Sequence, residues 1–126
     1  AHHPREIEAS LSSIREMWPD KRLTVAFQPH LYSRTNDFYP EFAKSLNLAD
    51  QVILLDIYPA REQPIPGVTS GLIAERLTVP FVWVTKEEFP EYVKENVKEG
   101  IFMTVGAGDI DRFIPIFTEM FGGTDC

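Results

Sequence analysis

The side chains best suited to polar recognition in this sequence are histidines and one arginine. His2 and His3 stand side by side near the start, and His30 is followed four residues later by Arg34. A guanidinium group offers a planar pair of N–H donors that matches the two oxygens of a carboxylate, and imidazole can orient the same group. We therefore predict that Arg34, together with imidazole side chains, binds an anionic substrate group such as a carboxylate. A solvated loop arginine and a structural histidine cap are the alternative interpretations.

A metal site or a covalent nucleophile would be other uses of these histidines. Zinc sites normally combine Cys, His or acidic ligands at regular short spacing, and two adjacent histidines cannot easily chelate one ion. The one cysteine, Cys126, is the last residue, and no Ser-His-Asp or Cys-His set is recognisable. The sequence therefore predicts no metal site and assigns no catalytic residue.

A second candidate for anion binding is the glycine-rich segment Gly106-Ala107-Gly108-Asp109. A strand-to-helix turn of this kind presents free backbone N–H groups and the positive end of a helix dipole. We name Gly106, Gly108 and Asp109, together with His3, as possible contacts to a nucleotide or another anion. The segment lacks the third glycine of a dinucleotide fingerprint and the Lys-Ser/Thr of a P-loop, and Asp109 equally suits a helix N-cap.

Two further groups of charged residues carry weaker signals. Glu62 follows a proline-rich turn, where it could contact a ligand or form a loop salt bridge, and the salt bridge is the favoured interpretation. Lys86, Glu87 and Glu88 are interpreted as the solvated face of a helix.

The elements that must position these residues alternate between strands and helices. Apolar spacings of three and four predict helices after Pro4, after Asp37 and Ser70 as N-caps, around Phe89 and after Asp109. Short apolar or β-branched runs predict strands over residues 23–27, 51–57, 81–84 and 101–105.

This alternation predicts an α/β fold, a Rossmann-like domain of three layers with a mostly parallel sheet over residues 1–126. Because the sequence begins with a helix and with Ala1 rather than Met, we expect a fragment of a longer chain whose first strand lies upstream. Ligands of such sheets bind beyond the carboxyl ends of the strands. Residues 28–35, 58–62 and 106–109 all follow predicted strands, so one edge of the sheet is the predicted site.

Composition narrows the possible partners. The chain has 126 residues, a formal net charge of −7 and 44% hydrophobic residues, which are values typical of one globular domain. An acidic chain is a poor match for phosphate backbones and anionic membranes, and no apolar run approaches the length of a membrane span. We therefore predict no nucleic-acid or membrane partner. A single cysteine fits a reducing compartment, and the cytoplasm is the expected location.

Four segments, taken together and in this order, closely resemble the C-terminal domain of the Mur ligase family. They are Ala1-His2-His3-Pro4, residues 27–35 (FQPHLYSRT), residues 56–62 (DIYPARE) and residues 106–110 (GAGDI). The resemblance extends over essentially the whole chain. One departure is Leu31, where the family commonly has an arginine, so this chain lacks one cation expected beside the site.

The resemblance implies an ATP-dependent bacterial ligase of peptidoglycan synthesis that joins L-alanine to UDP-N-acetylmuramate through an acyl phosphate. In such ligases an N-terminal domain binds the UDP sugar and a central domain holds ATP and Mg²⁺. The C-terminal domain closes over the site and helps position the amino acid. His2, His30 and Arg34 match positions on the amino-acid side of that site, and the isolated chain is expected to be inactive. Alternatives are a sister ligase that adds a peptide to the same nucleotide sugar and a non-catalytic doubly wound binding module.

Overall fold

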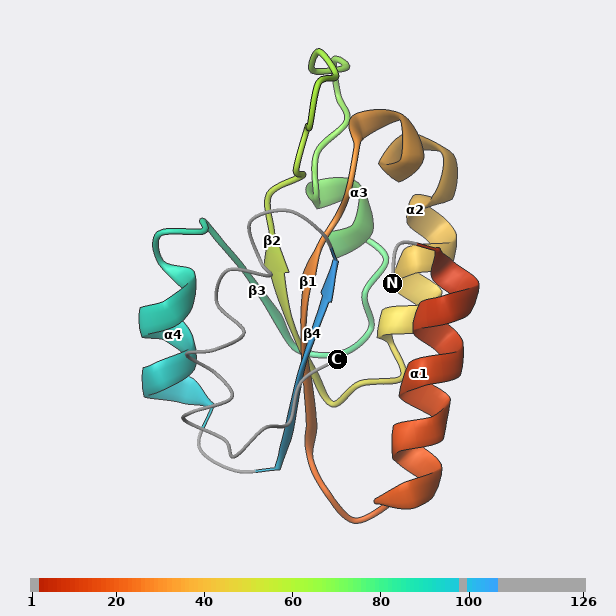
Figure 1. Cartoon of the computed structure of the whole chain (residues 1–126), viewed down its shortest axis with the longest axis vertical. Helices are drawn as coiled ribbons and strands as arrows, with labels where there is room; N and C mark the ends of the chain where they lie inside the picture. Colours follow the sequence, from red (N-terminus) through yellow and green to blue (C-terminus); the bar gives the residue numbers. More distant parts are fainter. Residues whose placement is uncertain (1–2, 98–99, 107–126) are drawn as a thin grey trace.

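The computed structural model describes residues 3–97 and 100–106 and contains four helices and four strands within them (Figure 1). The helices are α1 (Pro4–Met17), α2 (Tyr32–Leu46), α3 (Gly71–Ala74) and α4 (Phe89–Asn96). The strands are β1 (Leu23–Gln28), β2 (Gln51–Leu55), β3 (Phe81–Val84) and β4 (Ile101–Gly106). The predicted alternation is therefore confirmed up to the end of β4. The predicted last helix lies outside the described residues.

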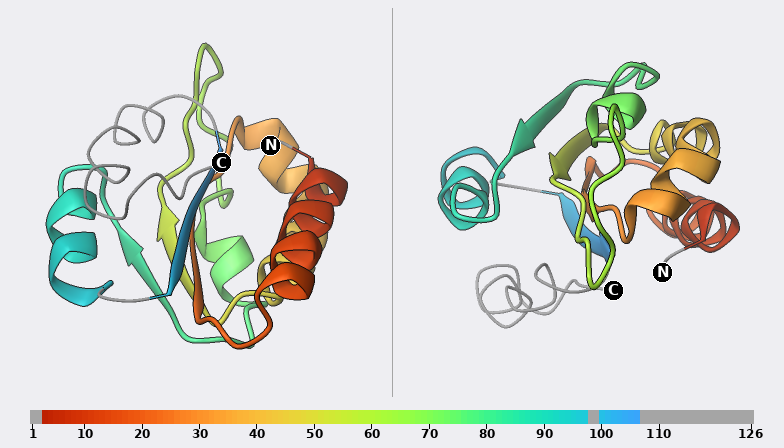
Figure 2. Two further views of the ribbon diagram at one scale, coloured as in Figure 1. Left: turned by 60° about the horizontal axis from the view of Figure 1, so that its bottom comes forward. Right: turned by 90° about the horizontal axis from the view of Figure 1, so that it is seen from above.

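The strands form one parallel sheet in the order β3-β2-β1-β4. Helices α1, α2 and α3 lie on one face of it and α4 lies on the other, which confirms the three-layer α/β architecture (Figure 2). The chain moves outward from β1 to β3 and then returns to place β4 on the other side of β1. Neighbouring strands in this order are hydrogen-bonded to each other, and the additional upstream strand stays a prediction.

The larger hydrophobic core lies between the sheet and the first three helices. Successive side chains of a strand point to opposite faces, and Val25 and Phe27 of β1 point to this one. Ile7 and Leu11 of α1 are fully buried here, as their helical spacing predicted. The other buried members are Leu23, Phe42, Ala43, Leu46, Ala49, Val52, Leu54, Ile73, Ile101, Met103 and Val105. Burying a side chain of this size stabilises the fold by about 1.5–3 kcal/mol.

The second core lies on the opposite face, beneath α4. Ala26 of β1 and Ile53 of β2 meet Phe89 and Val93 of α4, and all four are fully buried. The alternation along β1 and β2 therefore divides their side chains between two cores, which is the pattern of a sheet covered on both faces. Thus the continuous apolar run in β2 is correctly predicted as a doubly covered strand.

Helix α2 begins at Tyr32 and not at the predicted N-cap, Asp37. The residue before it, Leu31, has a φ of 71° and provides no side-chain cap, while Asp37 lies inside the helix and is exposed. The hydroxyl of Thr35 donates to the Leu31 carbonyl at 2.8 Å, which closes the first turn. The prediction was wrong because the side chain that caps this helix, Glu62, comes from a distant loop. As a result Arg34 lies on a helix and not in a loop.

Two other local predictions need correction. Ser70 precedes α3 as predicted, but its hydroxyl donates to the carbonyl of Leu55 and makes no capping bond to the helix. Lys86 and Glu87 lie in the turn between β3 and α4 and not on a helix face. No helix among the described residues is long and apolar enough to cross a membrane.

Candidate functional site

The candidate site lies at the carboxyl edge of the sheet, where the segments that follow β1 and β2 pair with each other. The Leu31 N–H donates to the Tyr58 carbonyl and the Tyr58 N–H donates to the Pro29 carbonyl, both at 2.8 Å. The rings of His30 and Tyr58 stack at 5.9 Å between centroids and 15° between planes. His30 is therefore fixed by backbone and ring contacts with a residue that the resemblance placed in a different motif.

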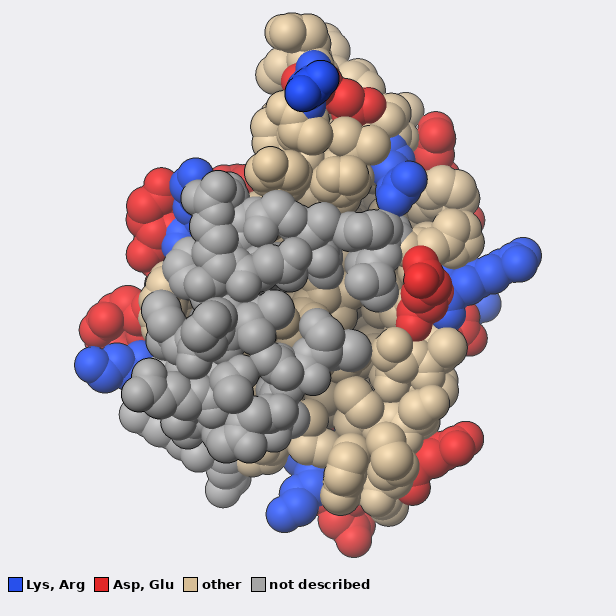
Figure 3. Space-filling view, viewed as in Figure 1, with Lys and Arg blue, Asp and Glu red and all other residues tan. Residues whose placement is uncertain are grey.

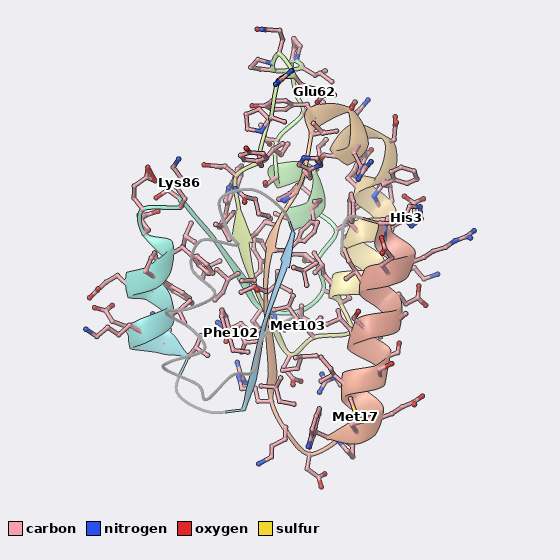
Figure 4. The ribbon with its side chains drawn as sticks, in the orientation of Figure 1. His3, Met17, Glu62, Lys86, Phe102 and Met103 are labelled. Atoms are coloured by element: carbon pink, nitrogen blue, oxygen red, sulfur yellow. The ribbon has the colours of Figure 1, made fainter. Side chains whose placement is uncertain are left out.

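A second link joins the same two segments through Glu62. Its carboxylate accepts hydrogen bonds from both the backbone N–H (3.0 Å) and the hydroxyl of Ser33, at the N-terminus of α2. These bonds from Ser33 hold the pKa of Glu62 below its ordinary value. The carboxylate serves as a helix cap, which corrects the predicted salt bridge. Glu62 lies on the loop that projects beyond the sheet (Figure 4).

Arg34 lies in the first turn of α2, directly after Ser33, whose N–H binds the Glu62 cap. The Arg34 side chain is half-buried. A cation at the positive end of a helix dipole is unfavourable by about 0.3–1 kcal/mol, and the first turn of α2 carries no acid of its own. A bound carboxylate or phosphate would offset this cost, which is the physical basis of the predicted role of Arg34 in anion binding, and that role stays a prediction.

Backbone strain is found at the same edge. Among the described residues, Leu31 (φ 71°) and Ala60 (φ 54°) have positive φ without being glycine. Such conformations cost about 1–3 kcal/mol each and persist where surrounding bonds enforce them. Here the bonds of Leu31 to Tyr58 and Thr35 enforce the first of them. Strain of this kind is concentrated in proteins at functional sites.

Two cavities open beside these loops and share Asp56 and Ile57 at the end of β2. One, of about 380 Å³, is lined by Gln28, Leu55, Asp56, Ile57, Pro59, Thr85, Lys86 and Glu87. The other, of about 250 Å³, is lined by Tyr32, Asp56, Ile57, Val68, Thr69, Ser70 and Trp83. Lys86 lies at the carboxyl end of β3 (Figure 4). The sequence interpretation did not single out Asp56 and Lys86, which line these cavities one residue after β2 and two residues after β3.

His3 has its own contacts, at the start of α1 and against α2. His3 is the N-cap of α1, its Nδ1 accepts a hydrogen bond from the Arg5 N–H at 3.1 Å, and its ring lies 5.4 Å from that of Phe38. It lines a groove of about 490 Å³ between α1 and α2 together with Glu41 and Lys44. Capping and helix packing are sufficient to explain its position, and its contact with an anion remains a prediction.

The other predicted site residues lie at or beyond the limits of the described chain. Gly106 is the last residue of β4 and pairs with Gln28, so it lies at the predicted edge. His2, Gly108 and Asp109 lie outside the described residues.

The charged side chains of the described residues form no metal cluster, and on one face of the molecule they are of mixed sign. No group of three His, Cys, Asp or Glu side chains within residues 3–97 and 100–106 could hold a metal ion. On the face seen in Figure 3, basic and acidic side chains of the described chain alternate around the outline.

Comparison with protein families gives one match that covers most of the chain. The model of the Mur ligase, glutamate ligase domain, matches residues 1–108. A UDP-N-acetylmuramate–L-alanine ligase of Phocaeicola vulgatus is 54% identical over 117 residues, which are 91% of this chain and 25% of that protein. The chain therefore spans about a quarter of the length of such curated relatives.

Solved structures show the same fold. A UDP-N-acetylmuramate–alanine ligase of Thermotoga maritima superposes with a TM-score of 0.68 at 26% identity, over 95% of this chain and 26% of that one. A second solved structure is a domain from Haemophilus ducreyi, described as part of a UDP-N-acetylmuramate:L-alanyl-gamma-D-glutamyl-meso-diaminopimelate ligase. It superposes with a TM-score of 0.67 at 19% identity, over 95% of this chain and 85% of that one. The second similarity concerns the fold alone.

Proposed function

Because this chain belongs to the Mur ligase family, through its glutamate ligase domain, we propose that it is the C-terminal domain of an ATP-dependent ligase that joins L-alanine to UDP-N-acetylmuramate. The observation that carries the proposal is the joining of two sequence motifs at the carboxyl edge, where Ser33 bonds to Glu62 and Leu31 bonds to Tyr58. We propose L-alanine and UDP-N-acetylmuramate as the substrates because the relative that is 54% identical is named for them.

In this function the domain binds and orients the amino acid and closes the site. The reaction converts a substrate carboxylate to an acyl phosphate, which the amine of alanine attacks with loss of phosphate. Such a step requires aligned reactants and exclusion of water, both of which a closing domain supplies. Arg34 stabilises an anionic group, and His30, held against Tyr58, orients it. His2 belongs to the same proposed set, while His3, Gly106, Gly108 and Asp109 are proposed contacts to nucleotide.

ATP and Mg²⁺ are not expected to be held by this chain alone. The sequence contains no P-loop, and the part of the chain that the structure describes has no cluster of metal ligands. We propose that the rest of the enzyme, its N-terminal and central domains, holds the cofactor and the UDP sugar. The carboxyl edge of the sheet is the surface that faces those domains, and the cytoplasm is the proposed location.

Release of inorganic phosphate tests this proposal. The full-length enzyme, given ATP, Mg²⁺ and UDP-N-acetylmuramate, should release phosphate with L-alanine and not with an L-alanyl-γ-D-glutamyl-meso-diaminopimelate tripeptide. The 126-residue chain alone should release none under the same conditions. Activity with the tripeptide only would replace the proposal by the sister ligase, and turnover by the chain alone would contradict the assignment of ATP to the other domains.

A further inference from the structure

The cavity of about 250 Å³ at the carboxyl edge has one charged group, Asp56, in a lining that otherwise consists of aromatic, aliphatic and hydroxyl side chains. The Trp83 Nε1–H donates to the Oδ1 oxygen of Asp56 at 2.8 Å. Tyr32 from the start of α2 contributes a second ring, and Ile57 and Val68 contribute aliphatic surface. The cavity thus brings together residues from α2, from β3 and from the loop between β2 and α3.

The polar groups of this lining select for a positive charge. The hydroxyl of Ser70 already donates to Leu55, and the Thr69 hydroxyl oxygen already accepts from the Gly71 N–H. Asp56 is exposed, and its carboxylate attracts cations and repels anions. The indole bond uses one carboxylate oxygen, and a carboxylate can accept further hydrogen bonds at the other.

The indole of Trp83 is held in place although its side chain is 45% exposed. Its bond to Asp56 fixes one end of the ring. The other end lies against α3, where a Cβ atom on Gly71 would come within 3.3 Å of the ring. Glycine at this position therefore lets the ring pack closely against α3. A fixed aromatic face beside a carboxylate is a recurrent way to bind an organic cation.

We propose that Asp56, Trp83 and Tyr32 form a binding site for a primary ammonium group on a short aliphatic chain. The ammonium donates to the Asp56 carboxylate and lies against the ring of Trp83, and its aliphatic part contacts Ile57 and Val68. Binding of an ammonium is independent of the proposed ligase reaction. The identification of that ammonium as the amine of the incoming amino acid rests on the proposed function.

The two tryptophans of the chain provide a direct test by NMR. In the ¹⁵N-labelled 126-residue chain, ethylammonium chloride should shift the indole N–H signal of Trp83 in a saturable manner. The signal of Trp18, which is 46% exposed and follows the last residue of α1, should stay in place and so report general salt effects. Sodium acetate should move neither signal. Equal shifts of both indole N–H signals would overturn the proposal. The absence of a shift in the Trp83 signal up to about 100 mM ethylammonium would also overturn it.

Two variants, each lacking one acidic side chain, distinguish ethylammonium binding at the proposed site from a general effect of charge. Asp56→Asn should weaken ethylammonium binding by about tenfold or more, because a hydrogen bond between charged groups is lost. Glu87→Gln is the matched control, since Glu87 lines only the neighbouring cavity, and it should change binding by less than about twofold. Equal effects of the two substitutions would contradict a site at Asp56.

Kinetics of the full-length enzyme test the ammonium site separately from the proposed function. If the amine of alanine occupies the site, Asp56→Asn should raise the KM for L-alanine by about tenfold while leaving that for ATP unchanged. An unchanged KM in an active enzyme would refute the identification of the ligand as the incoming amine. Ethylammonium binding by a chain whose full-length parent lacks ligase activity would refute the proposed function and leave the ammonium site intact.

Discussion

The amino and carboxyl edges of the sheet use arginine and aspartate in different ways. At the amino edge, Arg15 and Asp50 form an ion pair of 2.8 Å, and Asp50 also accepts from the Leu23 N–H at 2.7 Å. At the carboxyl edge, Arg34 lies at the start of a helix and Asp56 lies between two cavities. The first two charges pair with each other, whereas Arg34 and Asp56 belong to the proposed binding sites, where Asp56 also accepts from Trp83 of β3.

The turns at the two edges differ in a similar way. Gly100, before β4, has a φ of 89°, and a Cβ atom there would come within 2.3 Å of the Arg22 carbonyl oxygen. At the carboxyl edge Leu31 and Ala60 adopt positive φ in spite of their side chains. The amino edge therefore uses glycine where close packing requires it, whereas the carboxyl edge tolerates strain. This contrast indicates that stability determines the residues of one edge and binding those of the other.

The largest expected effect is that of Gly100→Ala on stability. The added Cβ would clash with the Arg22 backbone, so we expect a loss of about 3 kcal/mol or more in the free energy of unfolding. Gly67→Ala is the matched control, because Gly67 also has a positive φ (80°) but nothing lies within 4 Å of its added Cβ. It should cost about 1 kcal/mol. Urea unfolding measures both, and equal losses would contradict the close packing at the amino edge.

The next largest effect is expected on activity, and it is tested by replacing one arginine at each edge. Arg34→Ala in the full-length enzyme should lower kcat/KM for L-alanine by about tenfold or more, with little change in stability. Arg15→Ala should leave kcat/KM within about twofold and lower the free energy of unfolding by less than about 1 kcal/mol, since its ion pair is partly exposed. Steady-state kinetics and thermal unfolding measure both. Arg15→Ala with the larger kinetic effect would reverse the assignment of the two edges.

A smaller effect is expected from Glu62→Gln, which removes the charge from the cap of α2. The neutral amide should bind the Ser33 N–H less well, so hydrogen exchange of that amide should become several-fold faster. The matched control is Glu88→Gln, because Glu88 accepts from the Thr85 N–H before α4. It should leave Ser33 unchanged. Faster exchange at Ser33 in both variants would mean that Glu62 does not specifically cap α2.

The smallest effect is the pH dependence contributed by Asp50. Its hydrogen bond and ion pair with Arg15 lower its pKa below the ordinary 3.8, so the folded chain binds this proton less readily than the unfolded chain. The stabilisation is present above pH 3.8 and disappears as the pH falls through the lower, folded value. Asp50→Asn should therefore flatten the acid limb of a plot of unfolding free energy against pH. An unchanged slope below pH 4 would contradict this linkage.

Local patterns predicted most of the fold. The spacing of Ile7 and Leu11 located α1, and the unbroken apolar run that contains Ile53 located a strand covered on both faces. The carboxyl-edge rule placed His30 and Arg34 after β1, where the structure has them, while their role in binding stays a prediction. These predictions succeeded because each depends on neighbours within a few residues of the chain.

The failures involve contacts between distant parts of the chain. The sequence predicts Asp37 as an N-cap from its residue type and the apolar spacing behind it, whereas the structure caps α2 with Glu62, 29 residues from Ser33. The role of Asp56 depends on Trp83, which lies 27 residues further along. No local pattern contains such pairs, so they could be found only from the fold.

Hydrogen exchange of the full-length enzyme, with and without substrates, tests most directly whether the carboxyl edge is the binding edge. UDP-N-acetylmuramate, L-alanine, Mg²⁺ and a non-hydrolysable ATP analogue should together slow exchange in residues 28–35 and 56–62. Residues 15–22 and 48–51 at the amino edge should exchange at the same rate in both states. Protection confined to the amino edge, or absent from both edges, would contradict the assignment of the site.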